Sequence, residues 1–160
     1  MLKILSFIVI FTSLLSCGSA DNKYGEWEQD EHGTRFREDY ELKKQLSGYE
    51  LVKYNRIQGG QFGGGSSTTK FILCSDGSSR YYHQSQVTIS VEGAGGSDAS
   101  MDEDEGTWRA IENEKGLKLL IIKSTKYNTT GYMEIRPQGS KLQMVWYDEW
   151  QEFHMQKIDC

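Results

Sequence analysis

The chain has 160 residues, enough for one domain, and a formal net charge of −5. This acidic balance argues against a nucleic acid or an anionic membrane surface as the partner, because both bind clusters of Lys and Arg. Seventeen Gly, nine Tyr and four Trp beside a single Pro are typical of an all-β protein with many short strands joined by glycine turns.

Residues 1–16 have the pattern of a signal peptide. Lys3 supplies a positive charge near the start, and a nearly unbroken apolar run follows from Ile4 to Leu15. The run is shorter than the roughly 20 apolar residues that a transmembrane helix needs. We therefore predict export from the cytoplasm, with residues 1–16 removed.

The apolar run ends in Leu-Leu-Ser-Cys at residues 14–17, and this sequence resembles the lipobox of bacterial lipoproteins. The resemblance implies a diacylglycerol on the Cys17 sulfur, cleavage before Cys17, and an acyl chain such as palmitate on the new amino group. Several acyl chains are enough for stable membrane attachment. Gly18 follows where an Asp would favour inner-membrane retention in some bacteria, so we expect a lipid anchor at the outer membrane of a bacterial cell envelope. In the alternative, Cys17 is an ordinary residue near a signal cleavage site.

Cys74 and Cys160 are the remaining cysteines. Because an exported chain enters an oxidising compartment, two cysteines can form one disulfide. The sequence leaves two alternatives open, a Cys74–Cys160 disulfide or a buried Cys74 thiol with a free Cys160 at the chain end.

Two segments precede the expected strands. Residues 17–37 are mostly polar and charged, so we expect a flexible tether that holds the domain away from the lipid. Leu42 and Leu46 lie four residues apart within residues 38–46, which predicts a short helix with one apolar stripe. The folded domain is expected over residues 38–160.

From Tyr49 onward the apolar period changes to two residues, the period of a β-strand. Asp76-Gly77 lies between two such runs and predicts a hairpin with a type I′ turn, in which both central residues have positive φ. The runs up to Ile158 predict about eight strands and no second helix. A sheet of meandering strands removes its exposed edges by closing into a barrel.

Two segments without strand periodicity are expected to be long loops, at residues 59–67 and 93–105. The first is rich in Gly and Ser, but no Gly-Lys-Ser/Thr closes it, so a phosphate-binding loop is not indicated. The second carries five carboxylates between Asp98 and Glu105, which would suit a hard cation such as calcium. Their spacing does not fit the helix-loop-helix calcium site, and we expect a solvated acidic loop without a metal or cofactor.

Three short motifs stand at the ends of expected strands. They are Leu46-Ser47-Gly48-Tyr49, Leu73-Cys74-Ser75-Asp76-Gly77 and Gly106-Thr107-Trp108. Together they resemble small bacterial lipocalin-like lipoproteins over residues 46–158. The resemblance implies an up-and-down antiparallel barrel of about eight strands, whose apolar interior can hold a small molecule.

Strand alternation predicts which side chains point into the barrel. Candidates for the lining of a ligand cavity are Leu51, Phe71, Leu73, Trp108, Leu119, Ile121, Met133, Met144 and Trp146. The rest of the expected inward face consists of Val87, Ile89, Ile135 and Leu142. The same residues would also make a plain packed core, and alternation does not separate a core from a cavity.

No arrangement of residues indicates an enzyme. No Gly-x-Ser-x-Gly is present, and His32, His83 and His154 each lack a second metal ligand at a helix or turn spacing. We expect a membrane-anchored protein that binds a small apolar or amphipathic ligand. The alternative is a protein-interaction lipoprotein, such as an inhibitor, an immunity factor or an envelope-assembly factor, that recognises its partner through the two long loops.

Overall fold

The computed structural model describes residues 23–30, 33–58, 63–91 and 94–160. The predicted signal peptide, Cys17 and His32 lie outside the described residues. Within the described part of the chain, no helix is long and apolar enough to cross a membrane.

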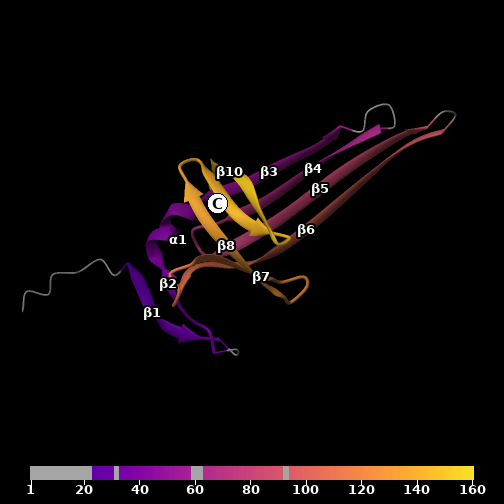
Figure 1. Ribbon diagram of the computed structural model, residues 1–160. Helices are drawn as coiled ribbons and strands as arrows, with labels where there is room; N and C mark the ends of the chain where they lie inside the picture. Colours follow the sequence, from indigo (N-terminus) through magenta and orange to yellow (C-terminus); the bar gives the residue numbers. More distant parts are fainter. Residues whose placement is uncertain (1–22, 31–32, 59–62, 92–93) are drawn as a thin grey trace, which may run out of the picture.

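Eight consecutive strands form a closed antiparallel barrel, which confirms the predicted fold class (Figure 1). Each strand pairs with the next along the chain, and the last pairs with the first. The barrel strands are β3 (Tyr49–Gln58), β4 (Gly63–Leu73), β5 (Ser78–Val91), β6 (Ala94–Asn113), β7 (Lys118–Ser124), β8 (Thr130–Gln138), β9 (Lys141–Trp146) and β10 (Glu149–Lys157).

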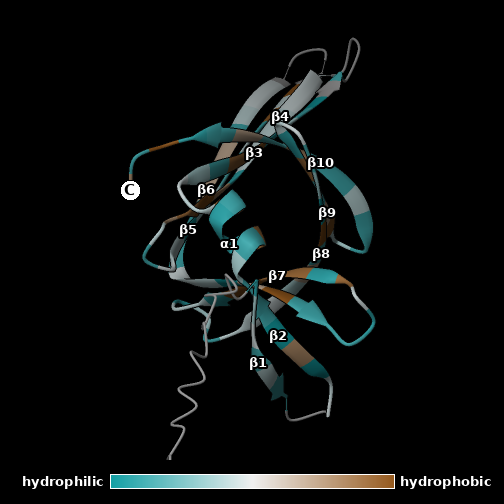
Figure 2. Ribbon diagram, turned by 90° about the vertical axis from the view of Figure 1, so that its left-hand side faces the viewer, coloured by the Kyte–Doolittle hydropathy of each residue, from teal (hydrophilic) through white to brown (hydrophobic). Residues whose placement is uncertain are grey.

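One short helix, α1 (Tyr40–Leu46), covers one end of the barrel and lies within the ring of strands in Figure 2. The helix begins where the Asp39 carboxylate accepts a hydrogen bond from the backbone N–H of Leu42, at 2.9 Å. Leu42 and Leu46 are fully buried in the same hydrophobic cluster as the barrel core, as their spacing predicts. Gly48, with a φ of +73°, then turns the chain into β3.

The predicted tether is wrong for residues 24–29 and 33–37. They form most of a hairpin of β1 (Tyr24–Gln29) and β2 (Arg35–Asp39), and β2 pairs with residues 111–113 of β6. The Arg37 guanidinium lies 2.8 Å from the Glu112 carboxylate and 3.6 Å from the centre of the Tyr24 ring. Contacts with charged groups on β6 therefore order a segment whose polar composition suggested a tether.

The two predicted long loops are also wrong where the structure describes them. Residues 63–67 belong to β4 and residues 94–105 to β6, with pairing that extends to Gln58↔Gly64 and Val91↔Ala94. Strand pairing uses backbone groups, so Gly and Ser can take part without leaving an apolar alternation in the sequence. Residues 59–62 and 92–93 lie outside the described residues.

These strand ends project from the barrel as a four-stranded ribbon (Figure 1). β10 pairs with β3 only at residues 49–52 of β3, and β7 pairs with β6 only at residues 106–112 of β6. In the part that projects, β3, β4, β5 and β6 pair only with one another among the described residues. We call residues 53–58, 63–69, 83–91 and 94–102 the ribbon. Val87 and Ile89 lie in the ribbon and are exposed, so their predicted place in the barrel interior is wrong.

The direction of β7 side chains also differs from the prediction. Leu120 pairs with Ala110 and Met133 and belongs to the core cluster, and Ile122 packs against that cluster. Leu119 and Ile121 therefore point to the outer face of the barrel, although Ile121 is buried there. Because both faces of β7 are apolar, alternation alone could not decide its orientation.

The Asp76-Gly77 hairpin forms as predicted, but the turn type differs. Gly77 has a φ of +86°, and its N–H donates to the Cys74 carbonyl at 3.1 Å. Asp76 is not in the left-handed region, so the turn is of type I followed by a glycine bulge rather than type I′. Beside it, Cys74 and Cys160 form a disulfide that joins the end of β4 to the end of the chain.

Candidate ligand-binding site

The two ends of the barrel differ in how they are filled. At the α1 end, side chains from every barrel strand except β5 meet the two helix leucines in a continuous core. At the opposite end, which we call the mouth, the structure has a cavity of about 420 Å³. Six aromatic residues line it: Phe71, Tyr81, Tyr127, Tyr132, Trp146 and Tyr147. The other lining residues are Asp104, Ile122, Ser124, Thr129, Gly131, Met133, Val145 and Asp148.

Four of these rings are in mutual contact. The ring centres of Phe71 and Trp146 lie 5.1 Å apart with an interplanar angle of 79°, and those of Trp146 and Tyr147 lie 5.1 Å apart at 69°. The Tyr81 ring is 5.1 Å from Phe71. Steep angles between neighbouring rings are one of the preferred aromatic geometries.

Tyr147 occupies its place in the mouth through an uncommon backbone conformation. Trp146 pairs with Glu149, which leaves Tyr147 and Asp148 as a two-residue turn with φ values of 52° and 63°. A turn of this kind favours Asn and Gly, and a bulky residue in the left-handed region costs on the order of 1–3 kcal/mol. Backbone strain of this kind is concentrated at functional sites, which supports a role for the Tyr147 ring at the mouth.

The polar groups of the mouth have distinct partners. Burial, followed by Tyr147 and Asp102, raises the pKa of Tyr81 to about 12, so its hydroxyl is uncharged at neutral pH. The Asp104 carboxylate accepts a hydrogen bond from the backbone N–H of Lys126 at 3.1 Å. The Lys126 ammonium pairs with the Asp102 carboxylate, and this contact raises the pKa of Lys126 and lowers that of Asp102.

The predicted cavity residues divide into three groups. Phe71, Met133 and Trp146 line the mouth. A second group lies in the packed core below it: Leu51, Leu73, Trp108 and Met144. Leu119 and Ile121 lie outside the barrel, so they are wrong as cavity residues. The structure therefore contains both a core and a cavity, at different levels of the same barrel.

Trp108 shows why the lower level is a core. Its side chain is buried, and its indole N–H donates to the Cys74 carbonyl at 2.9 Å. Its backbone N–H donates to the Gly77 carbonyl at the same turn. Trp108 thus holds β6 against the hairpin between β4 and β5 instead of lining a space for a ligand.

Sequence reasoning did not predict the tyrosines and the two aspartates of the mouth as site residues. Three of these six residues, Tyr127, Tyr147 and Asp148, lie between strands, where apolar alternation ends. Tyr147-Asp148 between two strand-like runs is a turn signal, but nothing in it indicates that Tyr147 lies close enough to Tyr81 to affect its pKa.

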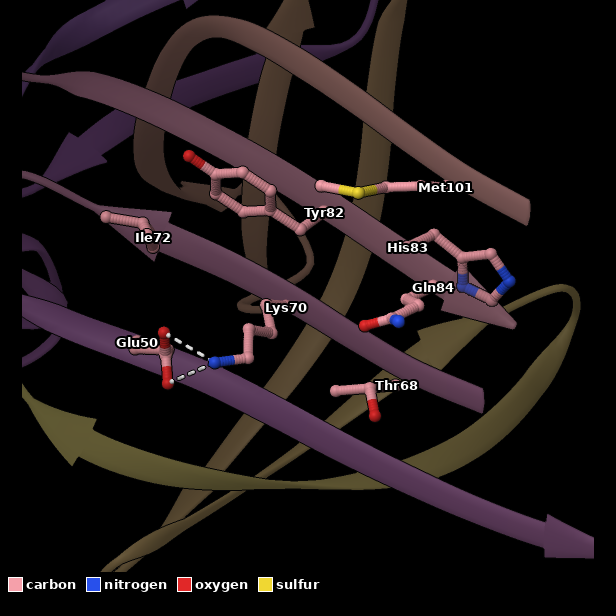
Figure 3. Close-up of a pocket in the computed structure, with 8 residues that line it drawn as sticks. All are labelled: Glu50, Thr68, Lys70, Ile72, Tyr82, His83, Gln84 and Met101. Atoms are coloured by element: carbon pink, nitrogen blue, oxygen red, sulfur yellow. Dashed lines mark hydrogen bonds and ion pairs between the residues drawn. The ribbon is translucent and has the colours of Figure 1, made fainter. Parts of the chain in front are cut away.

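A second hollow, of about 330 Å³, lies beside the barrel (Figure 3). Its residues come from β3, β4, β5 and β6, four neighbouring strands of one sheet, and it contains the Lys70–Glu50 ion pair at 3.3 Å. It lacks the ring cluster of the mouth, so the mouth is the better candidate for an amphipathic ligand. No group of three or more His, Cys, Asp or Glu in the described ranges is placed to hold a metal ion.

The chain was compared with protein-family profiles, curated proteins and solved structures, and none of them matches it.

Proposed function

We propose that this protein binds a small apolar or amphipathic molecule in the mouth of its barrel, and that lipid on Cys17 attaches it to a bacterial membrane. The observation that carries the binding role is the aromatic cavity of about 420 Å³. Ligand pockets commonly measure about 300–1,000 Å³ and combine an apolar lining with a few polar groups. The closed barrel is compatible with such a role.

The lining suits a molecule with one apolar end. Ile122 and Met133 stand beside the core and offer an apolar floor, whereas Asp104, Asp148 and the tyrosine hydroxyls lie among the lining groups that can meet a polar end. Burial of apolar ligand surface against the floor contributes about 25 cal/mol per Å². The polar groups would then orient the ligand in the mouth.

Gly131 offers a direct test of the cavity. It lines the mouth opposite Ile122, and a Cβ atom added there would meet only the Ile122 carbonyl oxygen, at 3.9 Å. Gly131→Phe therefore fills the cavity without a backbone clash. Thr130→Phe is the matched control, because Thr130 is the exposed neighbour on β8 and does not line the cavity.

The measurement is native mass spectrometry of protein exported in a bacterial host, followed by organic extraction. We expect a reproducible added mass on the wild type and on Thr130→Phe, and its loss from Gly131→Phe. A wild type that carries no added mass and binds no amphipathic probe in titration would contradict the binding role.

The lipid anchor has a separate test. Metabolic labelling with palmitate should mark the wild type and leave Cys17→Ala unlabelled, because the resemblance to a lipobox places the acyl groups on Cys17. Unlabelled wild-type protein in the membrane fraction would contradict the anchor and leave the mouth unaffected.

The ribbon favours a second candidate function, recognition of a protein partner. Among the described residues, no strand pairs with the outer edge of β3 at residues 53–58 or of β6 at residues 94–102, and unpaired strand edges can accept a further strand. Tyr54 and Met101, both about two-thirds exposed, lie on these two edges. This surface replaces the long loops as the place where a partner would bind.

Shortening the ribbon separates the two functions. Asn55, Ser67, Ser85 and Ser100 form one row across its four strands. Both hairpins can therefore be cut back to this row and closed with Asn-Gly turns. A ligand-binding protein should keep its added mass after this change, whereas a protein-interaction module should lose its partner in affinity purification.

A further inference from the structure

We infer that the ligand of the mouth carries a positive charge, as a quaternary ammonium or a protonated amine on an apolar body. This inference rests on the proposed binding function and adds the charge of the ligand to it. It follows from three features of the mouth: its aromatic faces, its unbalanced carboxylates and a cation that the protein itself holds at the rim.

The aromatic faces come first. The Trp146 ring stands at 79° to the Phe71 ring and at 69° to the Tyr147 ring, and all three residues line the cavity. The face of an aromatic ring is electron-rich and attracts a cation within about 6 Å of its centre. Several rings arranged as a corner or cage are the usual recognition element for alkylated ammonium groups.

The charges come second. Asp104 and Asp148 both line the cavity, and its described lining contains no Lys, Arg or His. Asp104 accepts one backbone hydrogen bond, and the structure gives neither carboxylate a salt bridge among the described residues. An anionic ligand would be repelled by these two carboxylates, whereas a cationic ligand would be attracted to both.

The third feature is Lys126 at the rim. Its ammonium lies 2.5 Å from the Asp102 carboxylate and 4.9 Å from the centre of the Tyr127 ring. One carboxylate and one tyrosine ring thus bind the Lys126 ammonium beside the cavity. Inside the cavity, Asp104 and Asp148 with the rings of Trp146 and Tyr147 offer the same combination of carboxylate and aromatic ring.

The carboxylates and rings fit an organic cation better than a metal ion. Hard metal ions take several oxygen ligands at once, and the described residues contain no cluster of three such side chains. The apolar floor at Ile122 and Met133 adds burial that only an organic ligand can use.

The test compares three probes with the same apolar chain: octyltrimethylammonium, octanol and octanoate, each titrated calorimetrically into the full-length protein. We expect octyltrimethylammonium to bind about tenfold more tightly than octanol, and octanoate to bind most weakly. Asp104→Asn and Asp148→Asn should each lower the affinity for the cation several-fold and leave the affinity for octanol unchanged. Glu103→Gln is the matched control, because Glu103 is an exposed carboxylate beside Asp104 that does not line the cavity.

The outcomes distinguish the charge of the ligand from the existence of the site. Octanol or octanoate binding as tightly as the cation would overturn the inference. A preference for the cation that survives when Asp104→Asn and Asp148→Asn are combined in one protein would also overturn it. In both cases the mouth would remain a ligand site. If none of the three probes binds, the proposed binding function fails and the inference fails with it. Asn keeps a hydrogen-bond acceptor at residue 104 and tolerates the positive φ at residue 148, so both variants are expected to fold.

Discussion

Asp39 carries a fully buried carboxylate that stabilises the start of α1. One oxygen accepts the Leu42 N–H at 2.9 Å, and the Lys118 ammonium lies 3.5 Å from the other. Asp39→Ala should lower the free energy of unfolding by about 1–2 kcal/mol, because it removes the helix cap. Asp39→Asn keeps an acceptor for Leu42 and should lose less. Urea unfolding measures both, and equal losses would mean that the charge, not the cap, matters.

Tyr81 makes the stability of the protein depend on pH in the alkaline range. Burial raises its pKa from 10.0 to about 12, so the folded protein holds a proton that the unfolded chain releases earlier. This contribution to stability is complete below pH 10 and is lost as the pH rises from about 10 to about 12. In a tyrosinate absorbance titration, Tyr81→Phe should remove a step at about pH 12. A Tyr81→Phe variant that keeps the step at about pH 12 would contradict the burial argument.

Among the elements, β6 must come close to β7 at Gly106. A Cβ atom at Gly106 would clash with the Lys123 carbonyl oxygen, whereas one at Gly96, on the same strand, meets nothing within 4 Å. Gly106→Ala should destabilise the protein by about 1–3 kcal/mol, because the two strands must move apart. Gly96→Ala is the control and should be neutral or stabilise by up to about 1 kcal/mol. Thermal unfolding compares the two, and similar midpoints would show that β6 can shift at no cost.

The disulfide joins two elements that are far apart in the chain. Cys74 and Cys160 are separated by 86 residues, and the bond lies beside the backbone hydrogen bond from the Ile158 N–H to the Gly48 carbonyl. Cys160→Ser should lower the free energy of unfolding by about 2–4 kcal/mol, because the unfolded chain regains the freedom of a long loop. Reductant should destabilise the wild type by a similar amount and leave Cys160→Ser unchanged. A wild type insensitive to reductant under unfolding conditions would contradict this expectation.

Across the whole molecule, stability should differ between the barrel and the ribbon. None of the residues of the core cluster comes from the ribbon. Within the ribbon, the side chains of Val87, Ile89 and Met101 are exposed. We therefore expect amides of the ribbon to exchange with solvent through local opening, faster than those of β7 to β9. Hydrogen exchange read by mass spectrometry measures this difference. Equal protection would indicate that ribbon and barrel unfold as one unit.

The barrel could be predicted because its signal is local. Phe71 and Leu73 lie two residues apart in one strand and both point into the core, and Leu42 with Leu46 marks one helical stripe. Hydrophobic burial on one face of a strand or helix requires such a period, whatever the rest of the chain does. The number of strands and the closed antiparallel fold follow from these periods together with the need to remove sheet edges.

The tertiary structure decided what depends on pairing between distant segments. The β1–β2 hairpin and the ribbon parts of β4 and β6 form through backbone and charge contacts that leave no apolar period, so their sequences suggested a tether and loops. β7 has two apolar faces, and only its pairing with Ala110 and Met133 decides that Leu120 points inward. The mouth combines Tyr81, Asp104 and Tyr147 from three parts of the chain. Their meeting depends on the register of the closed barrel, which no local pattern of residues encodes.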